Sequence, residues 1–341
     1  MTKNSHADST GNSVLPFPGE IPAGYLPLID EPEFDPGRHL ALEPPQSISS
    51  LEELGYSAES VAQCPSAFGV SAAFRILSDE GLSVMEDICS QIYFNRNDSG
   101  GTGKTRLGSF ARGAGYRSCF IRDFCDSVDL AEHLSRIAGV QLGRHSVPAV
   151  ACGINYAPED IAQAVDTWHV DSVAFDVVMM ISDPSVIKGG EFQVFQGTKD
   201  EGRSLLGIRG EEGRDSELPA DRVKTITFPA AGYGFLQQGN MIFHRACRLL
   251  EKAERVTMIP SFEVLPASCE DATNSINMLE WTDPGLEAEL ARREIWRTAA
   301  RLNVLLDTIS VSDDRSTLQR LIEDALEPLG SLQASLEKPR L

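Results

Sequence analysis

A histidine and an aspartate two positions apart, His169 and Asp171, offer an imidazole and a carboxylate that could bind a metal ion. They lie in an apolar, β-branched run over 167–180, which predicts a β-strand. Residues two apart on a strand point to the same face, so we expect the two side chains to lie side by side. A second histidine would complete a 2-His-1-carboxylate set, which holds iron(II) and leaves coordination positions open.

That second histidine must come from elsewhere in the chain. The sequence contains six histidines, and His244 is the only one that follows Asp171. It comes after a Gly-Asn turn and within a short apolar run, which predicts a strand. An ordinary core histidine, hydrogen-bonded to the backbone, is the alternative interpretation of this position.

An arginine begins the next apolar run. Arg255 comes eleven positions after the second histidine, and the strand period places it on the same face as Thr257. A guanidinium with a hydroxyl beside it is suited to binding a carboxylate. A surface ion pair with a nearby glutamate is the alternative, and Arg248 is the second candidate for the anion-binding role.

These residues, taken in order, resemble the ligand pattern of the iron(II)/2-oxoglutarate-dependent dioxygenase superfamily: His169-x-Asp171, His244 and Arg255-x-Thr257. A Gly-Gly-Glu-Phe stretch, Gly189–Phe192, lies between the ligands, as in the prolyl-hydroxylase-like and phytanoyl-CoA-hydroxylase-like branches. The resemblance covers roughly residues 148–265. It does not place the chain in one substrate family.

The resemblance implies a set of roles for these residues. Iron(II) would be held by the two histidines and the aspartate, while Arg255 and Thr257 would bind the far carboxylate of 2-oxoglutarate. Dioxygen would be the other co-substrate, and succinate and carbon dioxide would be released as a small molecule is hydroxylated, desaturated or cyclised. Tyr156 resembles a strand-end tyrosine that helps to hold the oxoacid, with routine packing as the alternative.

The substrate is expected to be a small molecule with an anionic group. Residues 96–122 hold six glycines and six basic residues with a single acid, in a chain whose formal net charge is −20. We expect Arg112 and Arg117 to contact the anion; a solvated basic loop is the alternative. Trp168 and Phe175 flank the metal-ligand pair and could wall the pocket, with core packing as the alternative.

Two other classes of function compete with an oxygenase. Asp98–Thr105 resembles a phosphate-binding loop, but that motif requires glycine where Asp98 stands, so we interpret the match as chance. A nucleotide-binding protein would use Gly100–Thr105. The other alternative is a non-redox β-barrel that binds a metal or small ligand without turnover.

The predicted fold class is mainly β with flanking helices. Short apolar runs separated by polar turns predict the strands, at 149–156, 168–181, 191–196, 224–228, 233–237, 241–247 and 255–264. Residues 197–222 are expected to form a surface loop or lid. The superfamily resemblance implies a double-stranded β-helix core, that is, a cupin-like jelly roll.

The chain divides into four expected parts: an irregular proline-rich arm at 1–50, a helical and Gly/Arg-rich part at 51–147, the catalytic core at 148–265 and C-terminal helices at 266–341. Within these parts we expect helices over 49–64, from Ser78 onward, over 127–138 and from Asp283-Pro284 onward. These helices are expected to brace the β core.

Composition restricts the partners and the compartment. A net charge of −20 over 341 residues repels nucleic acids and anionic membrane surfaces, which argues against both as partners. Seven cysteines without a CxxC pair predict reduced thiols. The polar first residues do not form a signal peptide, and no apolar run is long enough to span a membrane, so we expect a cytoplasmic protein. The sequence does not indicate the oligomeric state.

Overall fold

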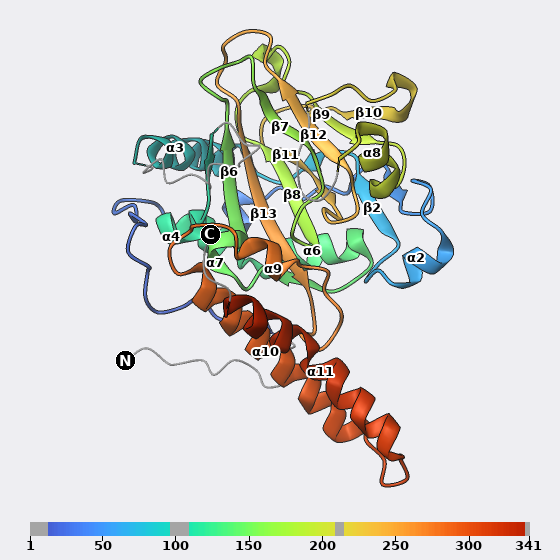
Figure 1. Ribbon diagram of the computed structural model, residues 1–341. Coiled ribbons are helices and arrows are strands. Elements are labelled where there is room, and N and C mark those ends of the chain that lie inside the picture. The colour runs from blue at the N-terminus through green and yellow to red at the C-terminus, as the bar shows by residue number, and fades with distance from the viewer. Residues whose placement is uncertain (1–12, 96–108, 209–214, 338–341) are drawn as a thin grey trace.

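The protein is built from two antiparallel β-sheets with helices on the outer face of the larger sheet (Figure 1). The computed structural model describes residues 13–95, 109–208 and 215–337. In these residues the strands are β1 (Ile48–Ser50), β2 (Phe68–Ser71), β3 (Phe74–Arg75), β4 (Phe110–Ala111), β5 (Leu142–Arg144), β6 (Cys152–Tyr156), β7 (Ala164–His169), β8 (Phe175–Met180), β9 (Phe192–Phe195), β10 (Val223–Ile226), β11 (Tyr233–Gln237), β12 (His244–Arg248) and β13 (Val256–Val264). The helices are α1 (Pro36–His39), α2 (Ala58–Ala62), α3 (Asp79–Asn95), α4 (Ala114–Arg117), α5 (Cys119–Cys125), α6 (Val128–Ala138), α7 (Pro148–Ala151), α8 (Lys199–Leu206), α9 (Ser275–Met278), α10 (Leu286–Thr308) and α11 (Arg315–Leu336), with 3-10 turns η1 (Pro184–Val186) and η2 (Ala220–Arg222).

The strand order shows how the two sheets are connected. The larger, nine-stranded sheet runs β1-β2-β11-β8-β13-β6-β4, with β3 paired to β11 and β5 paired to β13. The smaller, four-stranded sheet runs β10-β9-β12-β7. From β6 to β13 the chain therefore passes back and forth between the sheets, and only β9 and β10 follow one another in the same sheet. The expected fold class, mainly β with flanking helices, is confirmed.

Strand β8 shows how the larger sheet separates two cores. Val177 and Met179 pack with helices α3, α5 and α6, whereas Val178 and Met180 pack against strands of the smaller sheet. Side chains alternate between the two faces of a strand, so a strand covered on both sides is apolar throughout. The space between the sheets is the second core, and it also receives the candidate site residues.

Two of the expected helices are confirmed where their caps are clear. Helix α3 begins after Ser78, whose hydroxyl accepts from the Gly81 N–H at 3.0 Å. Helix α6 ends at Gly139, which has φ 69° and closes the last turn. Helix α10 begins at Leu286, beyond the predicted Asp283-Pro284 start, because Gly285 with φ 78° is the N-cap.

The single helix expected over 49–64 is wrong. The structure has β1, a turn and the short helix α2 in this region. Gly55 has φ +89°, a backbone conformation outside the helical region, and Ser57 then caps α2 by accepting from the Ser60 N–H at 3.2 Å.

The loop expected over 197–222 contains helix α8. Thr198 accepts from the Glu201 N–H at 3.2 Å, and Gly207 with φ 63° ends the helix. A threonine followed three residues later by glutamate is the sequence signature of a capping box, so the signal for this helix was present in the chain.

A buried ionic network fixes the C-terminal helices to the β-sandwich. Arg293 on α10 donates from Nε to Glu263 on β13 at 3.0 Å and also pairs with Asp271, while Arg297 Nη1 donates to Glu263 at 3.4 Å. Burial alone would raise the pKa of Glu263, but the nearby Arg293, His145 and Arg297 together outweigh this and lower it. Beyond this anchor, α10 and α11 extend as a hairpin away from the sheets (Figure 1). None of the helices in the described residues is long and apolar enough to cross a membrane.

We expect Arg293→Met to lower the free energy of unfolding by about 3–5 kcal/mol, because it leaves Glu263 and Asp271 buried without their main cation. Arg320→Met is the control: Arg320 is exposed on α11, and its loss is expected to cost within about 0.5 kcal/mol. Urea unfolding of the two variants measures the difference. Equal losses would contradict a stabilising role for the network.

Candidate metal centre

Two neighbouring strands place two histidines opposite each other. His169 is the last residue of β7, His244 is the first residue of β12, and they are register partners in the antiparallel pair. Directly opposite residues on adjacent strands have neighbouring side chains. The two imidazole centroids are 4.1 Å apart, and both rings are buried. The strand pairing therefore brings together histidines that are far apart in the sequence.

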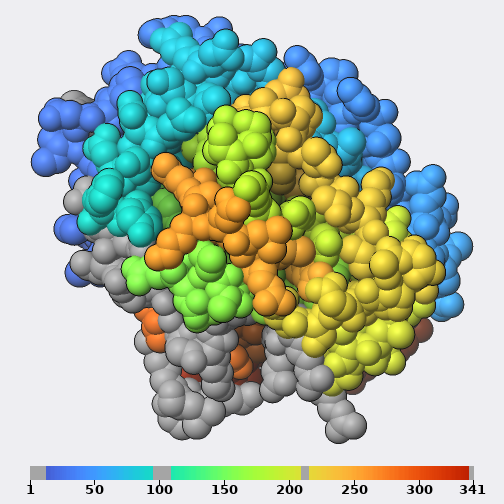
Figure 2. All heavy atoms as spheres, turned by 90° about the horizontal axis from the view of Figure 1, so that it is seen from above, coloured from blue at the N-terminus to red at the C-terminus, as the bar shows by residue number. Residues whose placement is uncertain are grey.

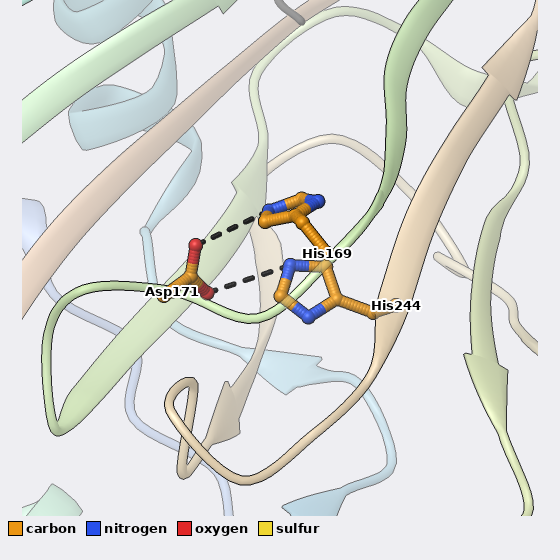
Figure 3. Close-up of side chains that lie close together, drawn as sticks. All are labelled: His169, Asp171 and His244. Atoms are coloured by element: carbon orange, nitrogen blue, oxygen red, sulfur yellow. Dashed lines mark ion pairs between the residues drawn. The ribbon is translucent and has the colours of Figure 1, made fainter. Parts of the chain in front are cut away.

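Asp171 reaches both histidines, although it does not lie on a strand. It follows the end of β7 in the loop that leads to β8, so the prediction that it shares a strand face with His169 is wrong. Its N–H donates to the Gly239 carbonyl at 2.9 Å, which fixes the loop. Its Oδ1 lies 3.3 Å from His169 Nε2 and its Oδ2 lies 3.4 Å from His244 Nε2, as the dashed lines in Figure 3 show.

In each histidine ring, the hydrogen bond made by Nδ1 determines whether Nε2 faces Asp171 with a hydrogen or with a lone pair. His169 Nδ1 lies 2.6 Å from the Thr167 carbonyl, and His244 Nδ1 lies 2.9 Å from the Ile242 carbonyl. A carbonyl only accepts, so each Nδ1 carries the hydrogen and each Nε2 keeps its lone pair. Burial, with the other imidazole beside it, lowers the pKa of His244 to about 4, so this ring is neutral at pH 7.

The three side chains fit a divalent cation. One ligand atom from each of His169, Asp171 and His244 lies within 4.8 Å of the others. The Nε2 atoms of both imidazoles face the Asp171 carboxylate, so a cation bound among the three groups would contact all of them. Two imidazoles and one carboxylate, with each imidazole Nδ1 bound to a carbonyl, form the donor set that suits iron(II) and related metals.

A fourth polar group, Asp166, enters the site through an irregularity in β7. His244 pairs with His169, but Ala246, two residues further along β12, pairs with Asp166, which is three residues back along β7. The extra residue makes a β-bulge and turns Asp166 toward the same side as His169. Asp166 Oδ2 lies 3.5 Å from His169 Nε2. The sequence pattern alone does not reveal Asp166, because period-two alternation places it on the face opposite His169.

Gln237 and Asp176 lie behind the aspartate ligand and were also missed. Gln237 Nε2 donates to Asp171 Oδ2 at 3.1 Å and to Asp176 Oδ1 at 2.9 Å. Burial and the nearby charge of Asp171 raise the pKa of Asp176 well above its ordinary value. These residues are brought to Asp171 by the pairing of β11 with β8, which the sequence does not reveal.

Arg255 is a buried cation just before β13. Its Nε donates to the Gly190 carbonyl at 3.1 Å, its Nη1 lies 3.5 Å from Thr257 Oγ1, and its residue exposure is 1%. Among the described residues, no carboxylate oxygen lies within 4.0 Å of it. Burial lowers its pKa to about 10, while the charge of Asp166 acts in the opposite direction. Within residues 13–95, 109–208 and 215–337, the guanidinium therefore lacks an anionic partner at contact distance.

The Gly-Gly pair noted in the sequence makes room for this arginine. Gly189 and Gly190 have φ values of 79° and 70°, which non-glycine residues rarely adopt. A Cβ on Gly190 would also stand 2.9 Å from Arg255 Cδ. Figure 2 shows the molecule from above relative to Figure 1. The segment that connects β12 to β13 crosses the middle of this view, between α3 and the α8–β10 region.

Three other predicted site residues lie away from the metal cluster. The Tyr156 hydroxyl donates to the Cys89 carbonyl of α3 at 2.8 Å, on the helix side of the larger sheet. Trp168 stacks on Phe243 with centroids 5.4 Å apart, and Phe175 belongs to the helix-side core. Trp168 precedes a ligand on β7 and therefore points to the opposite face. For Trp168 and Phe175 this placement matches the packing alternative.

The two predicted substrate arginines are engaged within the protein. Arg112 Nη1 lies 3.4 Å from Asp283 Oδ2, and its guanidinium lies 4.0 Å from the ring centroid of Trp281. Arg117 is 6% exposed, with its guanidinium 5.2 Å from the ring centroid of Tyr25. The structure brings neither of them into the group of metal ligands. The phosphate-loop-like stretch Asp98–Thr105 lies outside the described residues.

No family model matches the sequence, and no curated protein matches it. The chain is similar to several solved structures. SnoK, a non-heme alpha ketoglutarate dependent carbocyclase from nogalamycin biosynthesis, aligns with a TM-score of 0.40 at 16% identity over 64% of this chain and 90% of its own. SnoN, an epimerase from the same biosynthesis, has a TM-score of 0.40 at 11% identity over 57% and 78%. A 2OG-Fe(II) oxygenase family oxidoreductase from Burkholderia pseudomallei has a TM-score of 0.29 at 14% identity over 46% and 62%.

The likeness is distant, and what the site can do follows from its own geometry.

We expect His169→Ala and His244→Ala each to weaken Co²⁺ binding by more than about 100-fold, because loss of even a hydrogen-bond partner of a metal ligand costs about 10- to 100-fold. His133→Ala is the control, since His133 bonds the Glu43 carbonyl at 3.0 Å and is not part of the metal-ligand group. Calorimetric titration measures the affinities. Wild-type Co²⁺ affinity in either ligand variant would remove that residue from the site.

Proposed function

We propose that this protein is an iron(II)- and 2-oxoglutarate-dependent oxygenase that acts on a small molecule. One observation carries the proposal: His169, Asp171 and His244 converge inside the same sandwich that buries the guanidinium of Arg255, which has no carboxylate at contact distance within the described residues. Asp166 Oδ2 lies 3.5 Å from His169 Nε2 and adds a second carboxylate to the metal side of the site. Such a site needs a cation beside the three metal ligands and an anion beside Arg255.

The strand arrangement supports a double-stranded β-helix as the catalytic core, at residues 148–265. Strands β6, β8, β11 and β13 are in the larger sheet, and β7, β9, β10 and β12 are in the smaller one. Two facing antiparallel sheets whose strands alternate along the chain are typical of jelly rolls. We propose that the helical parts before and after this core brace it.

The co-substrate assignment rests on the charge at Arg255. A desolvated guanidinium is costly unless an anion offsets it, and Thr257 Oγ1 beside it adds a hydrogen-bond donor. A carboxylate is the anion that this pair suits. In 2-oxoglutarate the far carboxylate would bind here, while the 2-oxo acid end would reach the metal held by the two histidines and Asp171.

The proposed reaction converts 2-oxoglutarate, dioxygen and a C–H bond of the substrate into succinate, carbon dioxide and a hydroxylated product. Bound iron(II) would supply the redox chemistry that activates dioxygen. The protein's own part is to hold the metal through neutral imidazoles and one carboxylate, to bind the oxoacid through Arg255, and to exclude water through burial. Desaturation or ring closure would need the same site and the same co-substrates.

The test of this function measures succinate released from 2-oxoglutarate in the presence of iron(II) and dioxygen. We expect Arg255→Leu to weaken 2-oxoglutarate binding by roughly 10- to 100-fold, since a hydrogen bond to a charged group contributes about 1.5–3 kcal/mol. Arg248→Leu is the matched control, because Arg248 is exposed at the end of β12. A loss confined to Arg248→Leu would move the anion site, and metal binding without any succinate would favour a non-redox binding protein.

For the substrate we propose an anionic group that Arg112 recognises. Its side chain is 12% exposed, and its charge is shared with Asp283. We expect Arg112→Ala to raise the substrate KM roughly 10- to 100-fold while leaving 2-oxoglutarate affinity unchanged. Asp283→Asn keeps the cation but removes its partner, so it controls for disruption of the pair. An equal rise in KM in both variants, or a substrate without an anionic group, would contradict the proposal.

A further inference from the structure

A single side-chain amide joins the aspartate ligand to a second buried carboxylate. Gln237, at the end of β11, donates from Nε2 to Asp171 Oδ2 at 3.1 Å and to Asp176 Oδ1 at 2.9 Å. Gln237 is fully buried, and it is the register partner of Asp176 in the pairing of β11 with β8. The two N–H bonds of one amide nitrogen therefore connect a strand of the larger sheet to the loop that carries Asp171.

The orientation of the amide follows from its surroundings. With its nitrogen toward the pair, the amide donates to both Asp171 and Asp176, whereas a turned-over amide would place its oxygen against the Asp171 carboxylate and lose both hydrogen bonds. The Gln237 Oε1 atom is buried and has no hydrogen-bond partner among the described residues. A buried amide oxygen without a partner is costly. Gln237 therefore donates hydrogen bonds to two carboxyl groups, while its own oxygen accepts none from the described residues.

The turn that follows Gln237 holds the other side of Asp171. The Gly239 carbonyl accepts from the Asp171 N–H at 2.9 Å. A Cβ on Gly239 would stand 2.7 Å from Asp171 Oδ2 and 2.2 Å from Asp176 Oδ2, so only glycine fits without moving both carboxylates. The Asp171 backbone and side chain are thus both fixed by the short segment 237–239.

We propose that Gln237 is a positioning residue that fixes the rotation of the Asp171 carboxylate for the metal. Its hydrogen bond occupies Oδ2 and holds Oδ1 on the side of His169 Nε2, at 3.3 Å. The bond to Asp176 keeps the amide itself from rotating. This inference rests on the metal site of the proposed function, and it does not depend on the identity of the co-substrate.

The neighbouring residue provides a matched control. Gln238 is equally buried, but its Nε2 donates to the carbonyls of Ser66 and Phe68 at 3.2 and 2.6 Å. Gln237 and Gln238 each lose two hydrogen bonds when replaced by methionine, which keeps the length of the side chain. Both replacements therefore remove two hydrogen bonds from a fully buried amide, while only Gln237 contacts a metal ligand.

The experiment titrates wild type, Gln237→Met and Gln238→Met with Co²⁺ and records the visible bands of the bound ion, which report its coordination. Thermal unfolding of the metal-free proteins accompanies each titration. We expect Gln237→Met to weaken Co²⁺ binding by about 10- to 100-fold and to shift the bands, with Gln238→Met like wild type in both. A Gln237→Met protein that is folded and matches Gln238→Met in affinity and spectrum would overturn the inference.

A second variant keeps the test decisive if Gln237→Met does not fold. Gly239→Ala leaves the amide in place but pushes a methyl group against the same two carboxylates, so it should also weaken Co²⁺ binding and shift the bands. Unchanged affinity and bands in Gly239→Ala would overturn the inference. A wild-type protein that binds no Co²⁺ would overturn the metal site and this inference together. Co²⁺ binding without any turnover of 2-oxoglutarate would overturn only the proposed enzymatic function.

Discussion

The site depends first on the antiparallel pairing of β7 with β12. This pairing sets His169 opposite His244, and a bulge in β7 brings Asp166 to the same side. Asp171 completes the group, with its Oδ1 3.3 Å from His169 Nε2 and its Oδ2 3.4 Å from His244 Nε2. The strand pairing therefore holds three potential metal ligands together in a largely buried place.

Strand β13 connects this centre to the rest of the fold. Arg255 immediately precedes it and Thr257 is its second residue, while Glu263 near its other end is held by Arg293 of α10. The same strand pairs with β5, β6 and β8. The buried ion pairs under the C-terminal helices thus help to fix the strand that carries the candidate anion site. A rigid support of this kind suits a buried guanidinium that has no carboxylate partner in the part of the chain that the structure describes.

The metal ligands were accessible to sequence reasoning because their residue types and order limit the choices, and few histidines compete for the role. The local geometry was not accessible. Asp171 lies in a loop, and the bulge that recruits Asp166 leaves no pattern in the sequence. Tyr156 is on the helix side of its strand, because facing cannot be assigned until the strand's neighbours are known. The cap at Thr198, by contrast, was visible in the sequence, so α8 could have been predicted.

The central claim is that one buried site holds a metal through His169, Asp171 and His244 and an oxoacid through Arg255. The most direct measurement is an anaerobic titration of the protein with iron(II) and then 2-oxoglutarate, followed by visible absorption. The account predicts a new charge-transfer band that saturates at one equivalent of each, because the oxoacid must bind the iron directly. Iron(II) binding with no band upon saturating 2-oxoglutarate would contradict it.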